Sequence, residues 1–234
     1  ATPGPYAGPV PMVPHLHGGH SAQESDGYAE AWYLPQAKNI PSTFAEVGTW
    51  YQRFRVMAQA KHGQAWTPGT AVFQYENDQA AATMWYHDHT LGMTRVNVYA
   101  GPAGFYLLRG GPHDMSSGLP GPAPGVGANP FGTFYEIPIA IQDRSFNADG
   151  SLFYPDSRAF FDGFTGPYVP GSDVPPIWNP EFFGNSMVVN GRSWPFLNVE
   201  RRRYRFRFLN GCNSRFLILK IVARPTAKRP VQHV

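Results

Sequence analysis

Residues 83–108 read TMWYHDHTLGMTRVNVYAGPAGFYLL, and this stretch indicates a β-rich chain. Residues 83–86 are short and aromatic, which is typical of a strand that leads into the histidine pair after it. Residues 97–108 resemble a second strand, interrupted by a Gly-Pro-Ala-Gly segment. A short helix is compatible with residues 91–96 between the two.

Further short strands are predicted on both sides of this stretch from alternating or continuous apolar residues. Asn190-Gly191 indicates a hairpin turn, because both residues tolerate positive φ. No stretch indicates a long amphipathic helix. The additional predicted strands are 13–19, 50–58, 70–75, 135–142, 187–189, 194–199, 201–209 and 216–222.

Composition supports an all-β fold. The 234 residues include 25 Gly and 24 Pro, and charged residues make up only 15%. Frequent Gly and Pro suit many turns and argue against a helical bundle.

No apolar run reaches the roughly 18 residues that a membrane span needs, so we expect no membrane-spanning segment. The start of the chain shows no signal peptide.

The chain is expected to form two β-sandwich units. We place the first at residues 1–109 and the second, partial one at 133–222, joined by a Gly/Pro-rich linker at 110–132. Residues 223–234 form a basic tail. Each unit has four or five strand candidates where a sandwich has about seven, so both units are expected to be incomplete.

Positive charge is concentrated at the end of the chain. Residues 192–234 carry 11 Lys/Arg and one acidic residue, Glu200, whereas the whole chain has a net charge of +3. This pattern is compatible with a surface that binds nucleic acid. Strict alternation in RRRYRFRFL (201–209) favours instead a strand with its arginines outward and its aromatic residues inward. We therefore expect no nucleic-acid partner.

Four of the eight histidines form two pairs, His15/His17 and His87/His89. Residues i and i+2 of a strand point to one face, about 6–7 Å apart, so each pair can offer two imidazoles to one metal or to two adjacent metals. Imidazole suits Cu, Zn, Fe and Ni. The alternative to a metal site is that these are ordinary surface or core histidines whose alternation is a coincidence. Asp26 is either a turn residue or a carboxylate that assists the site.

Other candidate residues near these motifs carry less weight. Asp88 lies between two histidines and is expected to point to the opposite face, so it is not a predicted ligand. Cys212 is the single cysteine, which excludes a cysteine-rich metal site, and we expect it to be a small buried residue. A hydrolytic zinc enzyme would need a carboxylate base, for which only Asp26 or Glu24 is available.

Four segments in order resemble the multicopper oxidases, especially the branch of spore-coat laccases and bilirubin oxidases. They are PMVPHLHGG with ESDGYAEAWY (11–33), TMWYHDHTLGMTRVNVYAGPAGFYLL (83–108), EIPIAIQDRSF (136–146) and MVVNGRSWPFLNVERRRYRFRFLN (187–210). The resemblance implies cupredoxin-like Greek-key β-sandwiches, of which this chain carries the first and second. It also implies a secreted, periplasmic or spore-coat location.

The same resemblance implies a trinuclear copper cluster that reduces O2 to water with electrons from phenols, pigments or metal ions. By motif position, His15 would bind the type 2 copper, and His17, His87 and His89 would bind the type 3 pair. Asp26 matches a family acid that assists proton delivery.

The resemblance stops short of a complete oxidase. The family's His-x-x-His-x-His and His-Cys-His segments, which complete the cluster and form the type 1 site, do not occur in this sequence. We therefore expect the isolated chain to be weakly active or inactive. The sequence leaves open a truncated relative, a piece of a longer protein, a homo-oligomer or partner chain that supplies the missing ligands, and a non-catalytic copper-binding fragment.

Overall fold

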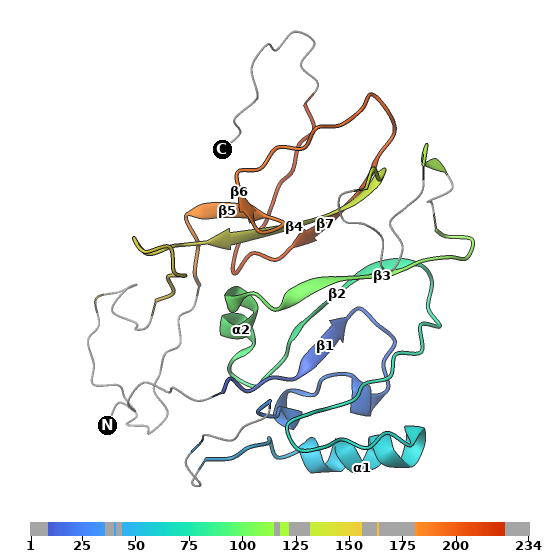
Figure 1. The fold of residues 1–234 in the computed structure, drawn as a ribbon, viewed down its shortest axis with the longest axis vertical. Helices are drawn as coiled ribbons and strands as arrows, with labels where there is room; N and C mark the ends of the chain where they lie inside the picture. Colours follow the sequence, from blue (N-terminus) through green and yellow to red (C-terminus); the bar gives the residue numbers. More distant parts are fainter. Residues whose placement is uncertain are drawn as a thin grey trace.

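The computed structural model describes residues 9–35, 40, 44–114, 118–121, 132–155, 163 and 181–222. Strands predominate in it, with two α-helices (Figure 1). The elements are β1 (Pro14–His17), η1 (Gln23–Ser25), η2 (Ala29–Ala31), α1 (Tyr51–His62), β2 (Ala82–Asp88), α2 (Thr94–Ala100), β3 (Ala103–Leu108), β4 (Glu136–Arg144), β5 (Ser186–Val189), β6 (Arg192–Ser193) and β7 (Arg205–Asn210).

The first sheet is antiparallel in the order β1-β2-β3. His15 pairs with His87 across β1 and β2, and His17 pairs with Trp85. Side chains directly opposite each other in an antiparallel pair share a face. The register therefore brings both histidine pairs to the same side of the sheet, while Leu16 lies buried on the other side.

The second sheet has the order β6-β5-β4-β7. β4 pairs antiparallel with β5 and parallel with β7. β5 and β6 form the expected hairpin, and Asn190 and Gly191 both have positive φ, 47° and 79°. Figure 1 shows this sheet on one side of the β1-β2-β3 sheet, with α1 at the opposite end of the molecule.

The largest departure from expectation is α1, because residues 50–58 were predicted as a strand. Tyr51, Phe54 and Ala58 are buried at the spacing i, i+3, i+7 that defines one face of a helix. The sequence WYQRFRVMA fits both periods, and the aromatic cluster around Trp66 selects the helix. Gly63, at φ 65°, ends it by donating its N–H to Gln59 O.

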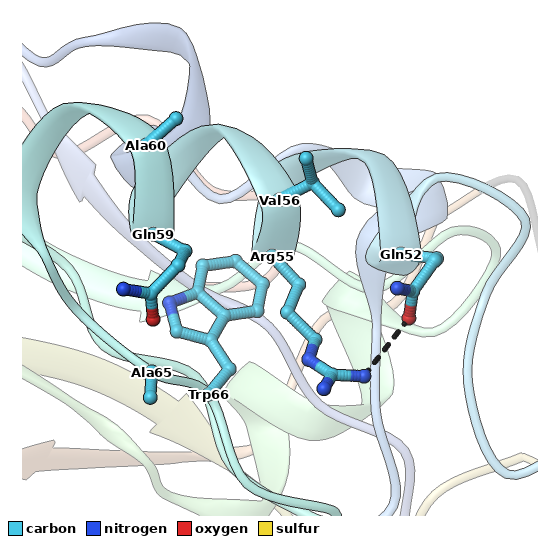
Figure 2. A pocket seen from close by; sticks show the side chains of 7 residues that line it. All are labelled: Gln52, Arg55, Val56, Gln59, Ala60, Ala65 and Trp66. Atoms are coloured by element: carbon cyan, nitrogen blue, oxygen red, sulfur yellow. Dashed lines mark hydrogen bonds between the residues drawn. The ribbon is translucent and has the colours of Figure 1, made fainter.

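The outer side of α1 carries a shallow pocket of about 310 Å³ (Figure 2). Arg55 and Gln52 lie along its edge, where Arg55 Nη1 donates to Gln52 Oε1 at 3.1 Å. The floor is Trp66, which is buried and whose indole N–H donates to Val72 O. The helix thus has an apolar buried face and a mixed exposed face, on which Val56 and Ala60 lie beside the polar side chains.

The strand expected over residues 97–108 is also corrected. Its first part is helix α2, which covers 94–100 rather than the 91–96 expected, and only 103–108 forms a strand, β3. Gly101, at φ 140°, separates the two. A positive φ of this kind is unfavourable for other residues and marks the point at which the chain changes structure.

Three further predicted strands do not form ladders. Residues 70–75 make one isolated bridge, from Tyr75 to Ser21, and residues 194–199 are irregular beyond β6. Residues 216–222 are also irregular, with Phe216 98% and Ile218 97% exposed. Within the described part of the chain no neighbouring strand pairs with them, and an apolar segment needs such a partner to become a strand.

The arginines of β7 face inward, opposite to the prediction. Arg207 is only 4% exposed, whereas Phe208 is 48% exposed. The reason is Glu136, a fully buried carboxylate that forms ion pairs with Arg109, Arg205 and Arg207. A buried charge requires such partners, and this requirement overrides the apolar preference of the interior.

Contacts join the two sheets. Arg207 Nη1 on β7 donates to Thr83 Oγ1 on β2 at 2.5 Å. The hydroxyl of Tyr99, on α2, donates to Phe153 O, in the segment after β4, at 2.7 Å. Most of the predicted linker (115–117 and 122–131) and all of the tail (223–234) lie outside the described residues, so the division into domains remains a prediction. Among the described helices, none is long and apolar enough to cross a membrane.

Candidate metal centre

Four imidazoles gather on one face of the β1-β2-β3 sheet. The centroid of the His15 ring lies 5.6 Å from His17, 5.4 Å from His87 and 4.9 Å from His89. One ring nitrogen from each of His15, His17 and His87 lies within 4.8 Å of the other two. All four predicted ligands are therefore brought together.

Backbone carbonyls fix the tautomers of two rings. His15 Nδ1 donates to Asp26 O at 2.5 Å, and His87 Nδ1 donates to Asp88 O at 2.6 Å. A proton on Nδ1 leaves Nε2 of a neutral imidazole with a free lone pair. Hydrogen bonds of this kind to the non-ligating nitrogen are characteristic of metal-binding histidines.

His17 is oriented differently. Its Nδ1 atom lies 3.3 Å from His87 Nε2. Metal–imidazole bonds are about 2.0 Å long in zinc sites, so two nitrogens at this separation can reach one ion. His89 Nδ1 is buried without a hydrogen-bond partner among the described residues. A buried polar nitrogen without a partner is unusual, and a metal ion would satisfy it. The donor set therefore fits a metal.

Burial influences the charge of the site. Desolvation lowers the pKa of His87 and of His89, and the positive charge that neighbouring histidines would carry lowers both further. Neutral imidazole is the form that binds a metal. The two rings are thus kept in their ligating state at neutral pH.

Asp88 holds the sheet beneath the histidines. Its side chain is buried and points away from them, as expected, and accepts four hydrogen bonds. The donors are the backbone N–H of Val13 and Thr90, the Thr90 hydroxyl and the Asn97 amide, at 2.8–3.0 Å. This carboxylate connects the start of β1, the end of β2 and α2. Alternation along β2 predicts the face on which Asp88 lies but not this role, because its donors come from distant positions in the sequence.

The two acidic candidates have different environments. Asp26 is half exposed, and its Oδ1 lies 3.5 Å from His15 Nδ1, so it adjoins the cluster. Glu24 is fully buried, and its carboxylate is hydrogen-bonded to Lys61 and His62 at 3.0 and 2.8 Å. Glu24 therefore anchors α1 and is not available as the base of a hydrolytic zinc site.

A cavity of about 400 Å³ adjoins the cluster. His17, His87 and His89 line one part of it, and Arg144 and Cys212 line another. The Cys212 thiol is half-buried rather than fully buried, and desolvation raises its pKa, so it stays protonated. Its place beside the histidines was not predicted, because no local pattern links positions so far apart in the sequence.

No protein-family model matches the chain. It is 37% identical over 217 residues to multicopper oxidase LPR1 homolog 1 of Oryza sativa, covering 93% of this chain and 30% of that protein. It is 40% identical over 207 residues to a laccase of Bacillus stratosphericus, covering 88% and 32%. The structure matches a variant of the McoA multicopper oxidase of Aquifex aeolicus with a TM-score of 0.52 at 23% identity, covering 88% and 32%.

The fold and the imidazole cluster define an all-β protein with incomplete cupredoxin-like domains and a group of histidines that could hold a metal ion. The chain belongs to the multicopper oxidase family, and it spans about 30% of the length of the curated relatives it matches. Membership in this family implies copper as the cofactor.

Proposed function

We propose that His15, His17, His87 and His89 bind copper and supply part of the ligands of an oxygen-reducing centre. The observation that carries the proposal is the convergence of these rings, with a nitrogen of His15, His17 and His87 all within 4.8 Å. Such spacing allows several redox metals to lie close together. The complete protein would couple one-electron oxidation of phenolic or similar substrates to reduction of O2 to water.

The division of ligands between the two kinds of copper follows the resemblance to the family's motifs, and the tautomers are compatible with it. His15 would bind the type 2 copper through Nε2, since Asp26 O holds its Nδ1 proton. His17, His87 and His89 would bind the type 3 pair, in keeping with the facing nitrogens of His17 and His87. When bound, copper would supply the one-electron redox chemistry that imidazole lacks.

The residues of this chain orient the ligands and handle protons. The carbonyl groups of Asp26 and Asp88 fix two imidazoles, which saves the cost of ordering them when the metal binds. The Asp26 carboxylate, half exposed and next to His15, is placed to take a proton from solvent and hold it beside the cluster.

A second candidate is a copper-binding fragment or subunit without oxidase activity. It is favoured by the ligand set: the sequence holds four histidines that the motifs assign to the cluster, half of the family's set, and no type 1 motif. Further residues of a longer chain, a partner chain or a second copy would provide the other ligands.

Copper content tests the proposal. The chain is loaded with excess Cu²⁺, desalted and analysed for copper per chain, alongside His87→Ala and the control His20→Ala. His20 is an exposed histidine that contacts Asp78 outside the cluster. We expect one or more tightly held coppers, lost in His87→Ala and kept in His20→Ala. Equal copper in all three proteins, or none in the unmodified chain, contradicts the proposal.

Activity separates the two candidates. O2 uptake with a phenol by the copper-loaded chain supports a complete centre formed by association of chains. Bound copper with no O2 uptake supports the non-catalytic fragment.

A further inference from the structure

A buried guanidinium faces the cavity beside the histidine cluster. Arg144 is the last residue of β4 and is only 6% exposed. Its Cζ atom lies 4.7 Å from the centre of the Tyr99 ring. It lines the cavity of about 400 Å³ that His17, His87 and His89 also line. A positive charge and three rings of the histidine cluster thus line one cavity.

No carboxylate of the described residues is in ion-pair contact with Arg144, although the negative charge of Asp143 lies near enough to favour its protonated form. The adjacent Asp143 is used elsewhere: its Oδ2 accepts from Gly184 N at 2.8 Å and from Arg215 Nε at 3.1 Å. Its Oδ1 accepts from Asn213 N at 2.8 Å. The hydrogen bond recorded for the Arg144 guanidinium is from Nη1 to the Asp143 carbonyl oxygen, at 3.1 Å.

This arrangement leaves hydrogen-bonding capacity unused. A guanidinium has five N–H donors and stays charged at any ordinary pH. A buried charge without a counter-charge is costly, which is why such groups are normally paired. The donors form a planar fork that matches a carboxylate. An anion small enough for the cavity would match the donors of Arg144 that no described residue uses.

The position of the guanidinium is fixed before any ligand binds. The Tyr99 hydroxyl donates to Phe153 O at 2.7 Å and accepts from Ser145 N at 2.9 Å. The ring beneath Arg144 is thus held by the chain that follows β4. A group held rigidly loses less entropy on binding, so the site is preorganised.

We propose that this cavity binds a small carboxylate-type anion, held by Arg144 beside the histidine cluster. The proposal goes beyond copper binding and does not require it. Its consequence for copper rests on the proposed function: an anion in the same cavity would balance the positive charge of a bound metal ion, so each would strengthen binding of the other.

The test uses the metal-free chain with acetate as the probe, followed by ligand-observed NMR, and with acetamide as an uncharged control of similar shape. We expect saturable binding of acetate and none of acetamide. Arg144→Gln should weaken acetate binding by about tenfold or more, because it removes charge-assisted hydrogen bonds. Equal binding of acetate and acetamide, or no saturable binding of acetate, overturns the proposal.

Arg53→Gln is the matched control. Arg53 Cζ also lies 4.7 Å from an aromatic ring, that of Trp50, but the residue is exposed and does not line the cavity. The variant makes the same change in charge and should leave acetate binding unaltered. Equal loss of acetate binding in the Arg53 and Arg144 variants would show a general charge effect and contradict the proposal.

A further measurement does not depend on the folding of any variant. Cys212 lines the same cavity, so its alkylation by neutral iodoacetamide reports access to it. Acetate, but not acetamide, should slow the alkylation of Cys212 in the unmodified chain in a saturable way. An alkylation rate unaffected by acetate counts against the site.

Copper provides a separate arm of the test. If copper binds as proposed, acetate should raise its affinity, and copper should raise the affinity for acetate by the same factor. Failure of copper binding would leave the metal-free result standing, so the two proposals can fail independently.

Discussion

The carbonyl oxygen of Asp26 accepts a hydrogen bond from His15 Nδ1 at 2.5 Å. This contact couples the loop after η1 to the histidine cluster. It selects the tautomer in which His15 Nε2 is free to bind a metal. The position of the loop, as well as the ligand itself, therefore determines how well the site is formed.

Gly27 makes that position possible. Its φ is +78°, and a Cβ built on it would lie 2.2 Å from Pro14 O, the carbonyl just before His15. We expect Gly27→Ala to displace the loop, to weaken copper binding, and to lower the free energy of unfolding by about 1–3 kcal/mol. Copper titration and urea denaturation measure the two effects.

Gly150→Ala is the control for this prediction. Gly150 has a similar φ, +85°, but nothing lies within 4 Å of a Cβ built on it. It should lose stability from backbone strain alone and keep full affinity for copper. If Gly27→Ala and Gly150→Ala lose the same affinity for copper, the close contact between Gly27 and Pro14 O does not determine how well the site is formed.

Asp88→Asn should destabilise the protein. The carboxylate accepts four hydrogen bonds in a buried position, and an amide can accept through only one of its two ends. We expect the free energy of unfolding to fall by about 2 kcal/mol or more in urea denaturation. Asp78→Asn, at an exposed position paired with His20, should change it by less than about 0.5 kcal/mol. A similar small change in Asp88→Asn would contradict this account.

Glu24 should make stability depend on acid pH. Burial alone would raise the pKa of its carboxyl, but hydrogen bonds from the backbone, Lys61 and His62 together outweigh it, so the pKa lies below its ordinary value of 4.5. A lowered pKa means that the folded state binds the proton less readily than the unfolded state. The contribution of Glu24 is present above pH 4.5 and is lost as the pH falls through the lower, folded value.

Urea denaturation between neutral and acid pH measures this loss. Glu24→Gln should be less stable at neutral pH and should lose less stability in acid, because the titrating group is absent. If the free energy of unfolding falls equally steeply with decreasing pH in both proteins, the acid dependence does not come from Glu24.

Tyr75 should titrate late in base. Burial, with the charges of Tyr106, Asp26 and Tyr33, raises its pKa from 10.0 to about 12. The protonated folded state is thus favoured below pH 10, and this contribution is lost as the pH rises toward 12. Ultraviolet titration of tyrosinate should show a late component that Tyr75→Phe removes. Persistence of the same late component in Tyr75→Phe would assign it to another tyrosine.

The sequence by itself determined the local features of this protein. The i, i+2 spacing placed His15 with His17 and Asp88 away from the cluster, and Asn190-Gly191 gave the hairpin turn, because alternation and turn geometry depend only on neighbouring residues. The resemblance to multicopper oxidases was likewise carried by short segments, and the comparisons confirmed it.

Only the tertiary structure decided the rest. Residues 51–58, within the predicted strand 50–58, are helical because an aromatic cluster buries one of the two possible faces. The arginines of β7 turned inward because Glu136, some seventy positions earlier, required their charge. Arg144 and Cys212 reached the histidine cavity through contacts between distant segments. Burial and charge pairing across long sequence separations have no local pattern, and so they emerge only when the chain is folded.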